Sequence, residues 1–260
     1  AITMVTANSP GSLFSITMSA KTSNTPIQVD WGDGVLKDYN ISFSTTVSST
    51  LAGNTVKIYG SNITYLNVYN RNLTSLDVSG ALNLKNLDCI QNKINSLDVS
   101  KNTFLTQLVC SSNNLSSIDL TNNLALTYLS CFSNALKSLD ITKNTELTSL
   151  YCYANQLSVL DVSQNSKLSI LDFGDNKLSY LTKMCLNDTR IYLPDHNLTY
   201  SDKSSMAASV EGRPPLTDHR IVEFMFSLPP NFRIKKSTQK YLLKKLSEKY
   251  IPREIIYRPK

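Results

Sequence analysis

"NLDCIQNKINSLDVSKN", residues 86–102, places a cysteine, asparagines and aspartates among leucines. Residues of these types bind metals and perform acid–base chemistry in many proteins. Here, however, the pattern recurs: cysteines stand at positions 89, 110, 131 and 152, each 21 residues apart, and Phe173 takes the next position. Self-similarity at a fixed period in the twenties is typical of a stacked solenoid.

Other positions repeat in phase with the cysteines. The unit reads L-x-x-L-x-C-x-x-N-x-L-x-x-L-D-V-S-x-N-x-x, and tetrads of the LDVS type begin at residues 76, 97, 118, 139 and 160. One set of asparagines occupies positions 92, 113, 134, 155 and 176, and a second set occupies 102, 123, 144 and 165. Five phased copies make the repeat the main structural signal of the chain.

The spacing within one copy predicts extended structure. Leu87 and Cys89 are two residues apart, so both point inward from a strand while Asp88 points outward. Leu97 and Val99 predict a second short strand in the same way. A coil of 21 residues leaves little room for a helix, and one coil cannot bury its own apolar face. Coils must therefore stack, at about 4.8 Å in the hydrogen-bonding direction.

This unit resembles a leucine-rich repeat, in a short form common in bacterial (Bacteroidetes-type) surface proteins, over about residues 56–180. The resemblance implies a β-rich solenoid of 21-residue repeats that binds a ligand. It also implies a protein at the bacterial cell surface or secreted from the cell.

The repeated polar residues have structural explanations. Buried cysteines act as small apolar side chains, whereas four thiols in a line do not make the tetrahedral site that zinc prefers. Asparagine amides supply donors and acceptors to the backbone of their own and adjacent coils. We predict no metal site, although calcium along the outward aspartates stays open. The predicted structural ladders are Cys89, Cys110, Cys131 and Cys152, with Asn92, Asn113, Asn134 and Asn155.

Function is expected where the repeat varies, on the outward positions of the Leu-x-Cys strands. Four aromatic residues fall on neighbouring coils there, and grouped exposed aromatics are typical of binding surfaces. They could equally pack against another part of this chain. The predicted ligand-binding surface comprises Asp88, Ile90, Val109, Tyr128, Phe132, Tyr151 and Tyr153.

Residues 1–55 predict a β-rich N-terminal module. Ser/Thr-rich segments with β-type alternation flank "PIQVDWGDGVLKDY", where Asp33-Gly34 is a hairpin-turn signal. The "VDWGDG" motif resembles the strand–turn motif of small bacterial β-sandwiches of the polycystic-kidney-disease type. The alternative, which we prefer, is a cap that shields the first coil of the solenoid (residues 56–183).

The remaining segment, residues 184–260, differs from the rest of the chain in its residue composition. Residues 1–180 hold 11 Lys/Arg and 12 Asp/Glu, a net charge of −1, whereas residues 181–260 hold 15 and 8, a net charge of +7. This shift marks a junction rather than a nucleic-acid site. The segments "TDHRIVEFMFSL" and "STQKYLLKKLSEKY" predict amphipathic helices. No run of about twenty apolar residues exists, so we predict no membrane span.

Long blocks of this segment, "YLPDHNL", "SMAASVEGRPPLTDHRIVEF", "SLPPNFRI", "QKYLLKKL" and "IPREIIYRPK", resemble the C-terminal end of glutamine-hydrolysing (class B) asparagine synthetases. The resemblance implies that Lys240 matches a lysine of that family's ATP and aspartate site. The family's ATP loop is S-G-G-x-D-S, whose amides bind pyrophosphate, yet no two of the eight glycines are adjacent here. The family's "GEGSDE" loop is also missing, and Ala1 stands where the glutaminase half needs a cysteine.

We therefore expect a non-catalytic leucine-rich-repeat module for a protein or glycan ligand, fused to an incomplete synthetase-like helical tail, with no cofactor. The tail is expected to dock on the last coil. One alternative is a tail that completes an ATP/aspartate amidotransferase site with another chain, in which case ATP is the cofactor and the cytoplasm is the location. Another is a fusion without selected function. The oligomeric state and the origin of the junction near residues 180–186 are not predicted.

Overall fold

A computed structural model describes residues 1–178, which form one compact unit. The predicted helices of residues 184–260, the role of Lys240 and the docking of the tail on the last coil fall outside these residues. Within the described part, no helix is long and apolar enough to cross a membrane.

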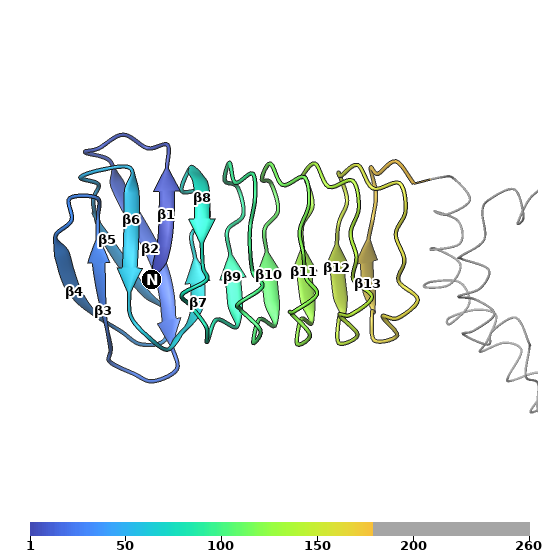
Figure 1. Cartoon of the computed structure of the whole chain (residues 1–260), viewed down its shortest axis with the longest axis horizontal. Helices are drawn as coiled ribbons and strands as arrows, with labels where there is room; N and C mark the ends of the chain where they lie inside the picture. The colour runs from blue at the N-terminus through green and yellow to red at the C-terminus, as the bar shows by residue number, and fades with distance from the viewer. Residues whose placement is uncertain (179–260) are drawn as a thin grey trace, which may run out of the picture. The chain divides into compact units, whose positions relative to one another are not determined.

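Two β-sheets form this unit (Figure 1). The five-stranded sheet has, in spatial order, β4 (Leu36–Ile41), β3 (Thr25–Asp30), β6 (Thr55–Tyr59), β1 (Ile2–Thr6) and β8 (Leu73–Asp77). The eight-stranded sheet has the order β13 (Ile170–Asp172), β12 (Ser149–Tyr151), β11 (Tyr128–Ser130), β10 (Gln107–Val109), β9 (Asn86–Asp88), β7 (Ile63–Asn67), β2 (Leu13–Ala20) and β5 (Thr45–Thr50).

The predicted solenoid of 21-residue repeats is confirmed. Strands β7 and β9 to β13 run parallel and pair in a register that aligns equivalent residues of successive coils, with Leu87, Leu108 and Leu129 side by side. These leucines are almost completely buried, and each coil from β9 to β12 adds a Leu-x-Cys pair to one continuous core. Each strand is only three residues long from β9 onward, so most of each coil is turn.

The second predicted strand is absent from these described coils: Leu97–Val99 and its equivalents are not strands. Leu97 and Val99 nevertheless point inward and are buried, while Asp98 is exposed. The Asp98 carboxylate accepts a hydrogen bond from the Ser100 N–H, which bends the chain into a turn. Only the first tetrad reaches into a strand: its Leu76 and Asp77 end β8, which pairs with β1.

The N-terminal module continues both sides of the first coil. Strand β1 pairs antiparallel with β8, and β2 pairs antiparallel with β7, so both sheets run unbroken from module into solenoid (Figure 1). Strand β6, which begins at the expected boundary at residue 55, pairs with β1 and β3. Paired strands thus cover the apolar end of the first coil and satisfy its edges.

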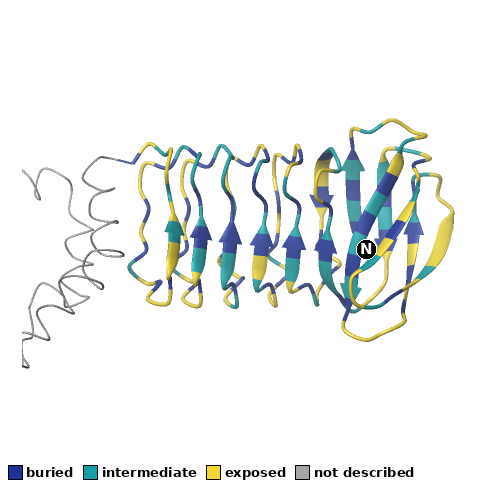
Figure 2. Cartoon of the chain, turned by 180° about the vertical axis from the view of Figure 1, so that it is seen from behind, coloured by how far each residue is buried: buried dark blue, intermediate teal, exposed yellow. Residues whose placement is uncertain are grey.

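The "VDWGDG" motif builds a turn and a core. Strands β3 and β4 form the expected antiparallel hairpin, and the Asp30 carboxylate accepts hydrogen bonds from the N–H groups of Gly32 (2.8 Å) and Gly34 (2.9 Å). Trp31 is fully buried and contacts Phe14 edge-on. Gly32 has φ +108° and lies so close to Gly53 that a side chain at either position would collide with backbone. Figure 2 shows buried and exposed residues alternating along the strands of this module.

Asparagine amides connect the coils at two places. In the first ladder, the Asn113 amide donates to the carbonyls of Cys110 in its own coil (3.1 Å) and Cys89 in the preceding coil (3.0 Å), and its oxygen accepts from the Ile94 N–H (3.0 Å). Asn92, Asn134, Asn155 and Asn176 make the equivalent bonds. Each amide thus satisfies buried backbone groups of two coils.

The second ladder uses donors only. The Asn123 amide donates to the carbonyls of Val99 and Asn102, both at 3.0 Å, in the preceding coil. Asn102, Asn144 and Asn165 donate in the same way. These four side chains are essentially inaccessible to solvent, so their amides bond backbone rather than water. Together the two ladders supply hydrogen bonds between coils for backbone groups that the three-residue strands do not pair.

We predict that Asn113→Asp destabilises the fold by about 3 kcal/mol or more. A carboxylate keeps the acceptor for Ile94 but loses both donors, leaving buried carbonyls unsatisfied and adding a buried charge. Urea unfolding followed by circular dichroism measures the change. Asn114→Asp, the same substitution at the exposed next residue, is expected to change stability by less than about 0.5 kcal/mol. Equal effects of the two substitutions would contradict the ladder.

Candidate functional site

The outer face of the eight-stranded sheet carries three columns of side chains over the solenoid. Strand register aligns the first two columns, and backbone hydrogen bonds between successive coils align the third. The first column is Tyr65, Asn86, Gln107, Tyr128, Ser149 and Ile170; the middle column is Asn67, Asp88, Val109, Ser130, Tyr151 and Asp172; the third column is Tyr69, Ile90, Ser111, Phe132, Tyr153 and Gly174. We call this surface the strand face.

The four aromatic residues predicted to cluster on the strand face lie together as two contacting pairs. The rings of Tyr128 and Tyr151 have centroids 5.7 Å apart and are tilted by 42°. The rings of Phe132 and Tyr153 stack at 4.5 Å with an angle of 8°. All four side chains are half-buried. Desolvation by partial burial is the main cause that raises the pKa of Tyr128, and the neighbouring Tyr151 is the second, so the Tyr128 hydroxyl stays a neutral hydrogen-bond donor at physiological pH.

Asp88 lies two coils before Tyr128 on the same face. Its carboxylate is half-buried and accepts hydrogen bonds from the Ile90 N–H (3.1 Å) and the Asn67 amide (3.3 Å). The same Asn67 amide donates to the Tyr65 hydroxyl at 3.0 Å. Desolvation raises the pKa of Asp88. Among residues 1–178, no cationic side chain forms an ion pair with this carboxylate.

The floor between Asp88 and the aromatic pairs consists of small residues. Val109 is half-buried, and Ser111 and Ser130 are buried and hydrogen bonded to each other through their hydroxyl groups at 2.8 Å. Ile90 lies on the Asp88 side of this floor. The structure therefore brings all seven predicted surface residues onto one face, with Asp88 and Ile90 at one end and the aromatic pairs at the other.

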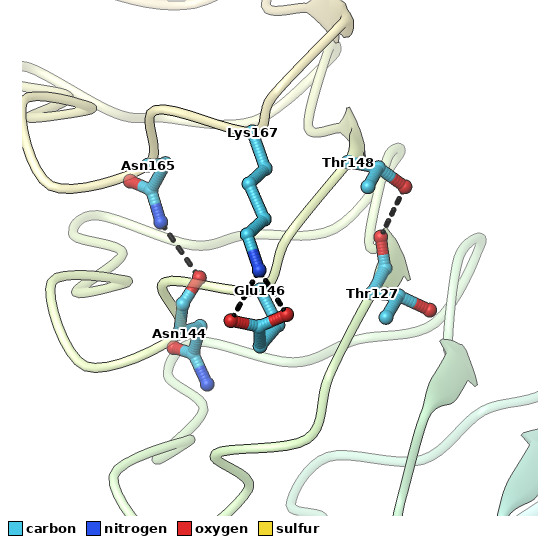
Figure 3. Close-up of polar contacts among 6 residues, drawn as sticks. All are labelled: Thr127, Asn144, Glu146, Thr148, Asn165 and Lys167. Carbon is cyan, nitrogen blue, oxygen red and sulfur yellow. Dashed lines mark hydrogen bonds and ion pairs between the residues drawn. The ribbon is translucent and has the colours of Figure 1, made fainter.

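Two features escaped the sequence-based prediction. Hydroxyls of Thr106, Thr127, Thr148 and Ser169 donate to the carbonyl one coil earlier, forming a third ladder. Figure 3 shows one step of it, Thr148 to Thr127, beside the Asn165–Asn144 step and the exposed Lys167–Glu146 ion pair. Threonine recurs at these positions in the sequence. Threonine is a common residue, however, and the position varies between copies, so its recurrence only weakly indicates a ladder.

The second missed feature is a row of exposed apolar side chains, which we call the apolar ridge. Leu82, Phe104 and Leu124 are 58%, 59% and 57% exposed and belong to the turns that precede β9, β10 and β11. These turns lie at one end of the strands that form the strand face. Each ridge residue stands at a variable position of the unit, where periodicity alone gives no information.

The cysteine column lies inside the solenoid. Cys89, Cys110, Cys131 and Cys152 are buried free thiols. Desolvation raises the pKa of Cys110 and of Cys152 to about 12, so both remain protonated and unreactive at neutral pH. No group of three or more metal-binding side chains occurs among the described residues.

The aspartates of the LDVS-type tetrads face solvent and serve turns. Hydrogen bonds from Ser100 and Thr121 lower the pKa of Asp98 and Asp119, respectively. Each carboxylate accepts from the backbone N–H two residues later, as Asp140 also does from Thr142. Their direct role is to close each turn, in contrast with Asp88, whose carboxylate lies on the strand face.

The fold defines the chain's class over the described residues: a leucine-rich-repeat solenoid with an N-terminal β module. Solved structures of similar fold include the functional domain of InlJ from Listeria monocytogenes, which includes a cysteine ladder. It is 32% identical, with 54% of this chain and 34% of that chain covered and a TM-score of 0.38. The protein LIC12759 of Leptospira interrogans is 22% identical, with 45% and 33% covered and a TM-score of 0.43.

Sequence comparison adds a family. The asparagine synthase family matches residues 118–260, more than half of the chain. The chain belongs to this family. Among curated relatives, asparagine synthetase [glutamine-hydrolyzing] 3 of Bacillus subtilis is 38% identical over 63 residues, and the human asparagine synthetase is 41% identical over 63 residues. The aligned segment is about a quarter of this chain and spans only 10% and 11% of these relatives. Residues 118–178 of the family match are solenoid coils in the structure.

We predict that the carboxylates titrate in a fixed order. Desolvation raises the pKa of Asp88, so its ionisation opposes folding as pH rises from the unfolded pKa of about 3.9 through the folded value. Hydrogen bonds lower the pKa of Asp98 and Asp119, so their stabilising effect is present above the unfolded pKa and is lost as pH falls through their folded values. Carboxyl-detected NMR titration should place Asp88 above 3.9 and the other two below it; a shared midpoint would contradict the structure.

Proposed function

We propose that the chain is a non-catalytic binding module that uses the strand face of its solenoid to bind a protein ligand outside a bacterial cell, at the surface or after secretion. The observation that carries this proposal is the grouping of Tyr128, Phe132, Tyr151 and Tyr153 on adjacent coils. Half-buried aromatic clusters on a rigid sheet are typical energetic centres of protein interfaces. The backbone ladders hold their positions before any ligand arrives, which reduces the entropy lost on binding.

A protein ligand fits this surface better than a glycan. Sugar rings stack on open aromatic faces, but Phe132 and Tyr153 already stack on each other, so one face of each ring is occupied. The adjoining apolar ridge adds three largely exposed side chains. Removal of such apolar area from water favours association with the apolar side chains of a protein and offers little to a polyhydroxylated ligand.

We predict that the full chain binds members of an array of extracellular protein domains. The affinity should fall at least about 100-fold in a quadruple variant that replaces the four aromatics by serine, because truncation of a central aromatic costs about 2 kcal/mol or more. The substitutions are Tyr128→Ser, Phe132→Ser, Tyr151→Ser and Tyr153→Ser. Surface plasmon resonance measures the affinities. The control, Phe43→Ser with Tyr59→Ser, removes exposed aromatics of the N-terminal module and should leave affinity unchanged. Binding retained by the quadruple variant, or signals on a glycan array alone, would contradict the proposal.

The family match favours a second candidate function. In it, the tail contributes to an ATP/aspartate amidotransferase site with another chain, and Lys240 helps to bind the nucleotide. Against independent synthetase activity stands the glycine pattern: the 260 residues contain no S-G-G-x-D-S sequence, and such a loop supplies the backbone amides that hold pyrophosphate. The first candidate function thus relies on the strand face, and the second relies on the tail.

We expect isothermal titration calorimetry with ATP-Mg²⁺ to detect no binding to the full chain alone, because the phosphate-binding loop is missing. Repeating the titration with aspartate, and with Lys240→Ala and Lys236→Ala variants, makes the test specific. ATP binding that Lys240→Ala abolishes and Lys236→Ala preserves would favour the amidotransferase candidate over a purely non-catalytic role.

A further inference from the structure

The charge of the strand face selects among protein ligands. Its three columns contain two charged side chains, Asp88 and Asp172, and both are acidic. No lysine or arginine occupies any outward position from β7 to β13 in these columns. An acidic, aromatic face attracts basic groups and repels acidic ones, since unpaired charges of like sign oppose association.

Of the two carboxylates, Asp88 has the surroundings that best suit a cationic ligand. It is half-buried, oriented by the Ile90 N–H and the Asn67 amide, and has no cationic partner among the described residues. Two hydrogen bonds occupy one lone pair on each oxygen, so each oxygen keeps accepting capacity toward the face. A partly desolvated carboxylate in this state gains more from an incoming cation than an exposed one does, because solvent screens it less.

The surroundings of Asp88 suit a long basic side chain. Tyr65 lies one coil before it and is linked to it through Asn67, and Tyr128 lies two coils after it on the same face. Val109 forms an apolar floor between the carboxylate and the tyrosine pair. Two coils span about 9.6 Å at the usual strand spacing, a distance that an arginine or lysine side chain and its own backbone can bridge.

We infer that the strand face recognises a peptide segment carrying an arginine or lysine, with the cationic group at Asp88 and the adjoining residues of the segment against the Tyr128–Tyr151 and Phe132–Tyr153 pairs. This inference rests on the proposed protein-binding function. Asp88 supplies charge selectivity through a charge-assisted hydrogen bond, and the aromatic pairs supply contact area. The two contributions come from different residues and are separable by substitution.

The test is a selection of displayed random 12-residue peptides on the full chain, with prior depletion on the Tyr151→Ser, Tyr153→Ser variant so that strand-face binders are retained. We expect the retained peptides to be enriched in Arg and Lys over Asp and Glu. Their dissociation constants should rise about 10-fold or more with Asp88→Asn, as loss of a hydrogen bond to a charged group implies. The control Asp98→Asn removes a charge from the same coil on another face and should change them less than about twofold.

The outcomes separate the two proposals. Retained peptides without basic enrichment, or with affinity unchanged by Asp88→Asn, would overturn the inference while leaving the strand face as a binding surface. Absence of any retained binder would overturn both. Because asparagine is nearly isosteric with aspartate and keeps the acceptor for the Ile90 N–H, circular dichroism of Asp88→Asn should match the parent chain, so a loss of affinity reports lost charge rather than lost fold.

Discussion

The structure of the solenoid depends on one interaction, the buried asparagine amide that bonds the backbone of its own coil and of the coil before it. Three-residue strands leave most of each coil outside the sheet ladder, and buried backbone groups without partners would cost about 1–3 kcal/mol each. Two asparagines per coil remove that cost at the turns, where no strand pairing exists. Threonine hydroxyls extend the same solution to a third place in the coil. Neighbouring coils are thus coupled through side-chain bonds as well as through strand pairing.

This coupling explains why identical polar residues are structural and variable ones are candidates for function. A cysteine or asparagine that returns every 21 residues meets the same surroundings in every coil, as the buried thiols and amides do. A residue such as Asp88 has no counterpart at Val109 or Ser130, so the ladders do not require it. Its desolvation cost, visible as a raised pKa, opposes folding slightly, and such local costs are often associated with functional sites.

The period and the inward Leu-x-Cys pattern were sufficient to predict the solenoid, because stacking requires every coil to repeat its core. The same pattern predicted a strand at Leu97–Val99, which does not form: inward packing needs only alternation, and here the Asp98 carboxylate bonds the Ser100 N–H and turns the chain. The left-handed residues Gln91, Ser112, Ser133, Ala154 and Asp175 were also not anticipated, since glycine is absent from that position in every copy. The backbone bonds of these turns impose the conformation against local preference.

The sequence predicts which aromatic residues lie on the strand face but not how their rings are oriented. Alternation along a strand places Tyr128, Tyr151, Phe132 and Tyr153 on one face, yet whether two rings stack or tilt depends on side-chain angles that the sequence does not encode locally. Phe132 and Tyr153 cover one face of each other's ring, which under the proposed function favours a peptide over a sugar as the ligand. Ser111 and Ser130 also occupy outward positions, yet both are buried and hydrogen bonded to each other. Neither the stacking of the rings nor the burial of these serines follows from alternation along a strand, because each depends on contacts between neighbouring coils.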